Sequence, residues 1–316
     1  MSPPGLWLAR EHPDRLEEAI ICLLGRHRAS SGEADNFLKY ARDNQLNLDN
    51  LVACPQPGAA PEEPLAFAVL CATNPGRTAM LLHSPPKSRD EIFPISQLAS
   101  YAISQLDREK VQLVQALVAP EDALGTETLQ QTGLHELAVL HYMERPAHTP
   151  IASNSKLPEN LQLQAYTQDD DEDVLTALET SYEGTLDCPG LRGLRQTKDI
   201  LAGHKATGTA ELNLWWVLRQ EERPVGVIML AAHKSANTLE LAYLGLAPEA
   251  RGRGAGSAML AWALKTADHL LPRTCHLAVD VDNGPAIALY KRFGFVSILK
   301  RRALTRALHD GDSGIK

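Results

Sequence analysis

The stretch that decides the fold is 239-LELAYLGLAPEARGRGAGSAMLAWA-263. An apolar strand is expected to end at Leu246, and an amphipathic helix is expected to begin near Gly256. The intervening Arg251–Gly256 holds three glycines, two arginines and one alanine. Glycines before a helix expose successive backbone N–H groups beside the positive end of the helix dipole, and the arginines add positive charge. The stretch therefore predicts a binding site for a di- or polyphosphate.

Three kinds of phosphate loop can be compared with this segment. The nucleoside-triphosphate loop requires a lysine after its last glycine, and the segment contains no lysine. The dinucleotide fingerprint GxGxx(G/A) fails at its sixth position, Ser257, and the strands expected before it are antiparallel. The third pattern, Arg/Gln-x-x-Gly-x-Gly/Ala, is matched in full by Arg251, Gly254 and Gly256. This match resembles the acyl-CoA pyrophosphate loop of the GNAT superfamily of N-acyltransferases.

A second motif follows at the expected distance, 282-DNGPAIALYKRFGF-295. It resembles the other signature of that superfamily, N-x-x-A-x-x-L-Y-x-x-x-G-F. Pro285 suits the first turn of a short helix, and Gly294 permits the left-handed residue that ends it. The resemblance covers about residues 160–305.

The fold class implied is α+β, with two GNAT-like domains that each contain a central, mostly antiparallel mixed sheet flanked by helices. The first half of the chain repeats the order of elements expected in the second half, which suggests an ancient duplication. Its counterpart of the phosphate loop, Pro85–Pro94, contains no glycine. We expect a degenerate GNAT-like domain over residues 1–145, a linker over 146–159, a catalytic domain over 160–307 and a flexible tail over 308–316.

The cofactor implied by the resemblance is acetyl-CoA. In the family, the strand before the loop splays from its neighbour, so that its backbone N–H groups can polarise the acyl carbonyl. Asn283 is expected to hydrogen-bond the pantetheine arm or an ordered water, and a turn-forming role before the helix is compatible with this. The expected cofactor-binding residues are Leu244, Gly245, Leu246, Arg251, Gly252, Arg253, Gly254, Ala255, Gly256, Ser257 and Asn283.

Two catalytic residues are expected. The family implies that Tyr290 is the general acid that protonates the leaving thiolate, because a phenol is protonated at neutral pH; the alternative is a core tyrosine. Glu240 is the candidate base, because it lies eleven positions before Arg251, where one branch of the family places its catalytic glutamate. Simple alternation places Glu240 on one strand face with Ala242, Leu244 and Leu246. An edge-exposed glutamate and a water chain acting as the base are the alternatives.

The acceptor side is less determined by the sequence. In this fold, the loop after the first helix of the domain flanks the acceptor. Tyr182, Glu183 and Asp187 lie in that loop and could hold a cationic amine. The alternative is that the loop is simply solvated.

Composition limits the remaining possibilities. The formal net charge is −8, of which residues 1–150 contribute −7, and this acidity argues against a nucleic-acid partner. The five cysteines are scattered and form no CxxC pair, which favours a reducing cytoplasm. No apolar run reaches the ~18 residues of a membrane helix, and the first residues resemble no secretory signal. We expect no metal site and no membrane partner, and either a monomer or a homodimer.

The function expected is transfer of an acetyl group from acetyl-CoA to a primary amine, on a small molecule or a peptide, by direct attack in a ternary complex. The alternatives are a non-catalytic acyl-CoA sensor or scaffold and a transferase of another acyl group.

Overall fold

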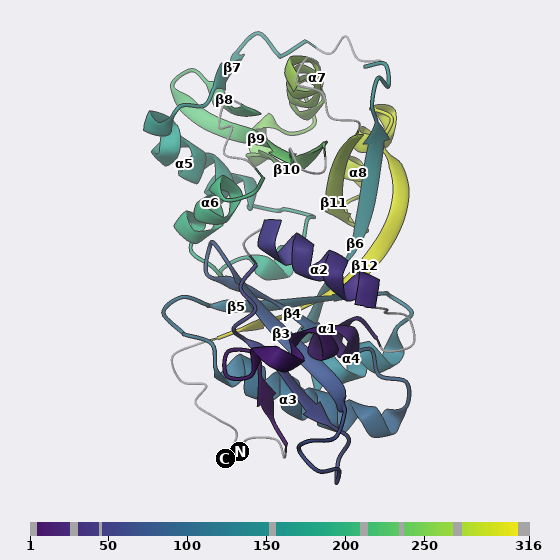
Figure 1. Cartoon of the computed structure of the whole chain (residues 1–316). Helices are drawn as coiled ribbons and strands as arrows, with labels where there is room; N and C mark the ends of the chain where they lie inside the picture. Colours follow the sequence, from purple (N-terminus) through teal and green to yellow (C-terminus); the bar gives the residue numbers. More distant parts are fainter. Residues whose placement is uncertain are drawn as a thin grey trace. The chain divides into compact units, whose positions relative to one another are not determined.

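The computed structural model describes residues 5–25, 31–43, 46–151, 156–208, 214–233, 237–267 and 274–308 (Figure 1). The chain divides into two compact units. Unit 1 comprises residues 1–137 and 302–316, and unit 2 comprises residues 138–301. Both units combine a mixed sheet with flanking helices, as the sequence predicts.

Unit 1 contains a sheet in the order β1-β2-β3-β4-β5-β12. Its β4 and β5 run parallel, and its other neighbours are antiparallel. The strands are β1 (Trp7–Leu8), β2 (Leu51–Pro55), β3 (Leu65–Asn74), β4 (Thr78–His83), β5 (Leu113–Val118) and the Arg302–Ala307 part of β12 (Val296–Ala307). The helices are α1 (Leu16–Leu24), α2 (Ser31–Asp43), α3 (Ile92–Ser104) and α4 (Ala123–Gln130).

The sheet of unit 1 is covered on both faces. Along β3, Phe67, Val69 and Cys71 pack in one apolar cluster with α3, while the alternate residues pack in another with α1. This follows from the two-residue period of a strand, which turns successive side chains to opposite faces. A strand buried on both faces has to be apolar throughout, which explains the continuous run of small and apolar residues in β3.

Unit 2 contains a sheet in the order β6-β11-β10-β9-β8-β7. Only β10 and β11 run parallel. The strands are β6 (His135–Pro146), β7 (Leu161–Ala165), β8 (Trp215–Gln220), β9 (Arg223–His233), β10 (Thr238–Leu246) and β11 (Thr274–Asp280). The helices are α5 (Asp171–Ser181), α6 (Thr197–Lys205), α7 (Ala255–Ala267) and α8 (Gly284–Arg292). One apolar cluster joins the sheet to α7 and α8, and a separate cluster joins it to α5 and α6 (Figure 1).

The compact units differ from the domain ranges expected from the sequence. The boundaries fall within β6 and β12 instead of in the segment 146–159. Residues 140–146 of β6 pair with β11 in unit 2, and residues 302–307 of β12 pair with β5 in unit 1. Of the expected tail, only Leu308 is described, and it is buried. Residues 152–155 of the expected linker lie outside the described residues.

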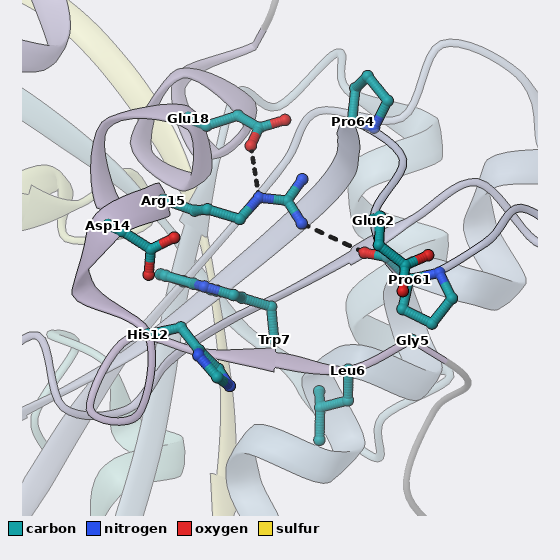
Figure 2. Close-up of a pocket in the computed structure, with 10 residues that line it drawn as sticks. All are labelled: Gly5, Leu6, Trp7, His12, Asp14, Arg15, Glu18, Pro61, Glu62 and Pro64. Carbon is teal, nitrogen blue, oxygen red and sulfur yellow. Dashed lines mark hydrogen bonds and ion pairs between the residues drawn. The ribbon is translucent and has the colours of Figure 1, made fainter.

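A pocket of about 820 Å³ opens in unit 1 (Figure 2). Arg15 crosses it and donates from Nε to Glu18 at 2.8 Å. The same guanidinium donates to the backbone carbonyls of Pro61 at 3.2 Å and Glu63 at 2.8 Å. These contacts tie the segment before β3 to the start of α1.

In the part of the chain that the structure describes, no helix is long and apolar enough to cross a membrane. Nor do the described residues gather three or more histidine, cysteine, aspartate or glutamate side chains in a way that could hold a metal ion.

Candidate active site

The phosphate-loop motif joins β10 to α7. The strand ends at Leu246, a short 3-10 turn follows over Pro248–Ala250, and α7 begins at Ala255. Gly252 and Gly254 have φ angles of +69° and +84°, in the left-handed region that favours glycine. A Cβ atom added at either position would meet nothing within 4 Å. The loop therefore leaves open space beside the first turn of α7, where backbone N–H groups attract an anion.

The side chain of Arg251 hydrogen-bonds backbone carbonyls of neighbouring segments. It donates to three backbone carbonyls: Leu246 at 2.9 Å, Ser181 at 2.8 Å and Gly184 at 3.1 Å. These oxygens belong to the end of β10, the end of α5 and the loop that follows α5. Arg251 thus joins three segments through its guanidinium group. Arg253 donates to the exposed Asn160 at 3.1 Å.

Replacing Arg251 with lysine is expected to lower the free energy of unfolding by roughly 1–3 kcal/mol, because an ammonium group cannot serve three carbonyls in the fork geometry of a guanidinium. Urea denaturation measures the change. The matched control is Arg253→Lys, a change on the exposed side of the same loop that is expected to stay within about 0.5 kcal/mol. Wild-type stability in Arg251→Lys would contradict the clamp and favour direct binding of phosphate by this side chain.

The strand before the loop separates from its parallel neighbour. Pairing between β10 and β11 is confined to Thr238–Glu240 opposite Thr274–His276. From there to Leu246, β10 keeps register with β9 alone among the described strands. The edge of β10 that faces β11 therefore has no strand partner among the described strands at Leu244–Leu246. These are the residues whose N–H groups the sequence predicts at the acyl carbonyl.

A β-bulge changes which side chains share a face of β10. Leu241 lies opposite Leu230, but Tyr243 lies opposite Met229, so Ala242 is an extra residue. The predicted face of Glu240, Ala242, Leu244 and Leu246 is therefore wrong. Beyond the bulge, Leu244 and Leu246 pack in the cluster with α7 and α8, whereas Tyr243 packs in the cluster with α5 and α6. Glu240 shares the face of Tyr243, because Glu240 pairs with Ala231 and Tyr243 with Met229, two residues away on β9.

Gly245 lies on this same face, where α5 comes closest to the strand. A Cβ atom at Gly245 would lie 2.7 Å from the Ser181 hydroxyl oxygen and 2.6 Å from Cε1 of Tyr243. Glycine is therefore required here by close packing. The approach is between the strand and the end of α5, and the same hydroxyl group lies 2.7 Å from the phenol oxygen of Tyr243.

Glu240 is partly exposed and has a specific partner. Its Oε2 lies 2.8 Å from Nε2 of His233, on the adjacent strand β9. The Glu240 side chain is 41% exposed and that of His233 is 32% exposed. The hydrogen bond to Glu240 raises the pKa of His233. The glutamate can thus be reached from solvent while one of its oxygens is held.

Tyr290 lies on α8 and is buried, with 7% of its surface exposed. Its ring packs against Phe295, with the ring centroids 5.8 Å apart, in the apolar cluster that the sheet forms with α7 and α8. Burial raises the pKa of the phenol, and the charges of Asp187 and Tyr243 act in the same direction. Tyr290 is therefore buried in the apolar core, and its phenol carries its proton at neutral pH.

The loop after α5 is held against the end of β11 by two carboxylates. Asp187 Oδ1 accepts from the backbone N–H of Asp280 at 2.8 Å, and Asp280 Oδ2 accepts from the N–H of Cys188 at 3.1 Å. Asp187 is exposed as a residue, but the protein around its carboxyl group removes solvation and, with the charge of Asp280, raises the pKa of Asp187. Asn283 donates to Asp187, and its Oδ1 accepts from the N–H of Ala286 as the N-cap of α8. The turn-forming role of Asn283 is therefore present, and the loop is more than a solvated segment.

An aromatic group beside Glu240 did not emerge from the sequence. Tyr182 and Tyr243 meet edge to face with centroids 6.3 Å apart, and His204 lies 5.5 Å from the ring of Tyr243. Burial raises the pKa of Tyr243 to about 12 and lowers that of His204 to about 4. Tyr182 belongs to this group, while Glu183 is exposed. The sequence does not predict that Tyr243 lies on the same face as Glu240, because the bulge at Ala242 interrupts the alternation of side chains along β10.

Comparison with known proteins gives consistent results. Residues 182–295 match the acetyltransferase (GNAT) family. Two mycothiol acetyltransferases share short segments with the chain. The one from Pseudarthrobacter chlorophenolicus is 41% identical over 56 residues, which are 18% of this chain and 17% of that protein. The one from Jonesia denitrificans is 36% identical over 76 residues, which are 24% of each chain. The aligned segments thus span about a quarter or less of either relative.

The fold of the whole chain is also shared with a solved structure. A GCN5-related N-acetyltransferase from Sphaerobacter thermophilus superimposes with a TM-score of 0.62, at 16% identity, over 98% of both chains. At this identity the likeness concerns the fold, and it includes both halves of the chain. Residues 182–295 thus match the acetyltransferase (GNAT) family, and both halves of the chain share the fold of this GCN5-related N-acetyltransferase.

Proposed function

We propose that unit 2 transfers an acetyl group from acetyl-CoA to a primary amine by direct attack in a ternary complex. The observation that carries the proposal is the separation of β10 from β11 immediately before a glycine loop that opens onto the start of α7. An open strand edge next to an anion-binding helix end suits a thioester that is joined to a pyrophosphate.

The cofactor would be held mainly by backbone groups. The N–H groups of Gly252–Ser257 would hold the pyrophosphate, beside the open space at Gly252 and Gly254. The N–H groups of Leu244–Leu246 would polarise the acyl carbonyl. Arg251 would support the cofactor site by holding the backbone carbonyls to which it donates. Asn283 would support it by capping the start of α8.

The proton transfers would use two side chains. Glu240 accepts the proton that the amine loses as its nitrogen attacks the carbonyl carbon. Tyr290 donates its proton to the sulfur as the carbon–sulfur bond breaks, and its phenolate is reprotonated from solvent. The raised pKa of Tyr290 means that the phenol carries its proton at neutral pH and is available as a donor.

The acceptor would be an amine on a small molecule or a peptide. Of the three expected acceptor residues, Tyr182 packs against Tyr243. Asp187 lies close enough to Tyr290 for its charge to raise the pKa of that phenol. Both therefore remain candidates to contact the amine, as does the exposed Glu183. Unit 1 has no glycine in Pro85–Pro94, and we propose that it binds no cofactor at that position. We also propose that the chain is a monomer or a homodimer and that it is located in the cytoplasm.

A thermal shift with acetyl-CoA, followed by thiol release with a panel of primary amines, tests the function. Stabilisation by about 2.7 kcal/mol is expected when the cofactor is present at 100 times its Kd. The control is Gly254→Val, because a β-branched residue at φ +84° disrupts the loop. Absence of stabilisation would exclude the acyl-CoA function, and binding without thiol release on any acceptor would favour the sensor.

A further inference from the structure

His233 and Glu240 form a pair on the face of unit 2 that packs against α5 and α6. His233 lies opposite Thr238 in the register of β9 and β10, and Glu240 lies two residues further along the same face. Cross-strand neighbours on one face lie within reach of long side chains, and here the Nε2–Oε2 distance is 2.8 Å. The pair is therefore built into the register of the two strands.

Other titratable groups surround this pair. His276 of β11 lies opposite Glu240, and its own partner is Glu144 of β6, 3.6 Å away. His204 of α6 is half-buried, and desolvation of its ring lowers its pKa to about 4, so it is neutral at neutral pH. The remaining charged and titratable groups near the pair are Tyr142 of β6, Tyr243 of β10, Cys275 of β11 and Arg195 before α6. Among the described residues, His233 is the histidine whose ring nitrogen lies within hydrogen-bond distance of Glu240, at 2.8 Å.

We propose that His233 is a positioning residue that holds Oε2 of Glu240 and, through its own protonation, switches the charge that the acceptor amine meets. This inference rests on the proposed function, because it assigns Glu240 as the base. With Oε2 occupied, Oε1 is the oxygen left to take the proton of the amine. Sequence alone cannot reveal this, because His233 lies outside both family motifs.

The switch has a definite sign. The hydrogen bond to Glu240 raises the pKa of His233 above the ordinary value of about 6.5. Below that raised pKa, the imidazolium neutralises the carboxylate, and acetyl transfer is slow. Above it, the imidazole loses the proton on Nδ1 and keeps the one on Nε2, so the hydrogen bond remains and the pair carries one negative charge. The rate is therefore expected to rise with pH through the pKa of His233.

Two substitutions separate position from charge. His233→Gln keeps an N–H donor at a similar reach but cannot titrate, so it should retain most of the turnover at high pH and lose the rise with pH. His233→Ala removes both properties and should lower kcat about tenfold, with KM for acetyl-CoA unchanged. The matched control is His276→Gln, the neighbouring half-buried histidine paired with Glu144, which should keep the wild-type pH profile.

A second measurement is independent of turnover. NMR titration of the His233 ring in the whole protein should give a pKa above the ordinary value, and Glu240→Gln should move it down. An unchanged His233 titration in Glu240→Gln overturns the proposal even where acetyl transfer is confirmed. So does a step in rate at the wild-type pKa of His233 that persists in His233→Gln, apart from the rise at higher pH that deprotonation of the amine itself causes. A coupled titration in a protein that binds acetyl-CoA but acetylates nothing would instead overturn the proposed function, and the kinetic role of His233 with it.

Discussion

Replacing Tyr290 with phenylalanine is expected to lower turnover about 10²- to 10⁴-fold, the range that a single general acid contributes. The phenol oxygen is removed while the ring keeps its place against Phe295 in the apolar cluster. Stabilisation by acetyl-CoA should stay close to wild type, because the phosphate loop and the edge of β10 are unaffected. Thiol release and thermal shift, measured on the same preparations, check both parts.

The matched control for this substitution is Tyr166→Phe. Tyr166 is another buried phenol of unit 2, with 4% of its surface exposed, and it bonds Asp171 in the cluster with α5 and α6. Its loss should affect stability and leave kcat near wild type. Because the pKa of Tyr290 is raised, its protonated form should persist beyond the ordinary tyrosine value of about 10, so this group should cause no alkaline loss of activity below that pH. Wild-type kcat in Tyr290→Phe would remove it as the acid.

Replacing Leu304 with alanine is expected to destabilise unit 1 by about 2–5 kcal/mol, the usual cost of a cavity left by a fully buried leucine. Leu304 is 0% exposed, lies opposite Ala116 of β5 and belongs to the cluster that contains α3. Amide hydrogen exchange followed by mass spectrometry should show the loss of protection in β5 and α3.

The position of that loss decides between two descriptions of the chain. If residues 160–307 formed one domain, protection would fall in β10 and α7, and β5 would be unaffected. Ile298→Ala is the control on the same strand, because Ile298 is 47% exposed and its loss should stay within about 0.5 kcal/mol. Lost protection in unit 2 alone would contradict the assignment of Arg302–Ala307 to unit 1.

Local features of the active half were predictable because they depend on neighbours in the chain. Gly252 and Gly254 have the left-handed backbone that a tight loop before a helix requires, and Asn283 caps α8 three residues before Ala286. Their motifs also identify the superfamily, which the family match over 182–295 confirms. The roles of Tyr290 and Glu240 stay predictions, although the structure shows the burial of one and the partner of the other.

Other features of the site could not be predicted because they depend on partners distant in the chain. Whether Arg251 faces an anion or three carbonyls depends on where α5 ends in space. The extra residue at Ala242 reverses the alternation of β10, and only the register with β9 reveals it. A single inserted residue turns every later side chain to the opposite face, so a correct strand prediction gave a wrong assignment of faces.

By itself, the sequence determined the order of elements and the glycine loop before α7, because short-range backbone geometry specifies both of them. Only the tertiary structure decided which strands complete which sheet. Pairing with β11 and the hydrogen bond from Arg145 Nε to the Phe293 carbonyl, at 2.8 Å, place the part of β6 from Leu140 to Pro146 in unit 2. The end of β12 belongs to unit 1 for the same reason: a strand's hydrogen bonds are satisfied by its neighbour in the sheet, whatever its distance along the chain.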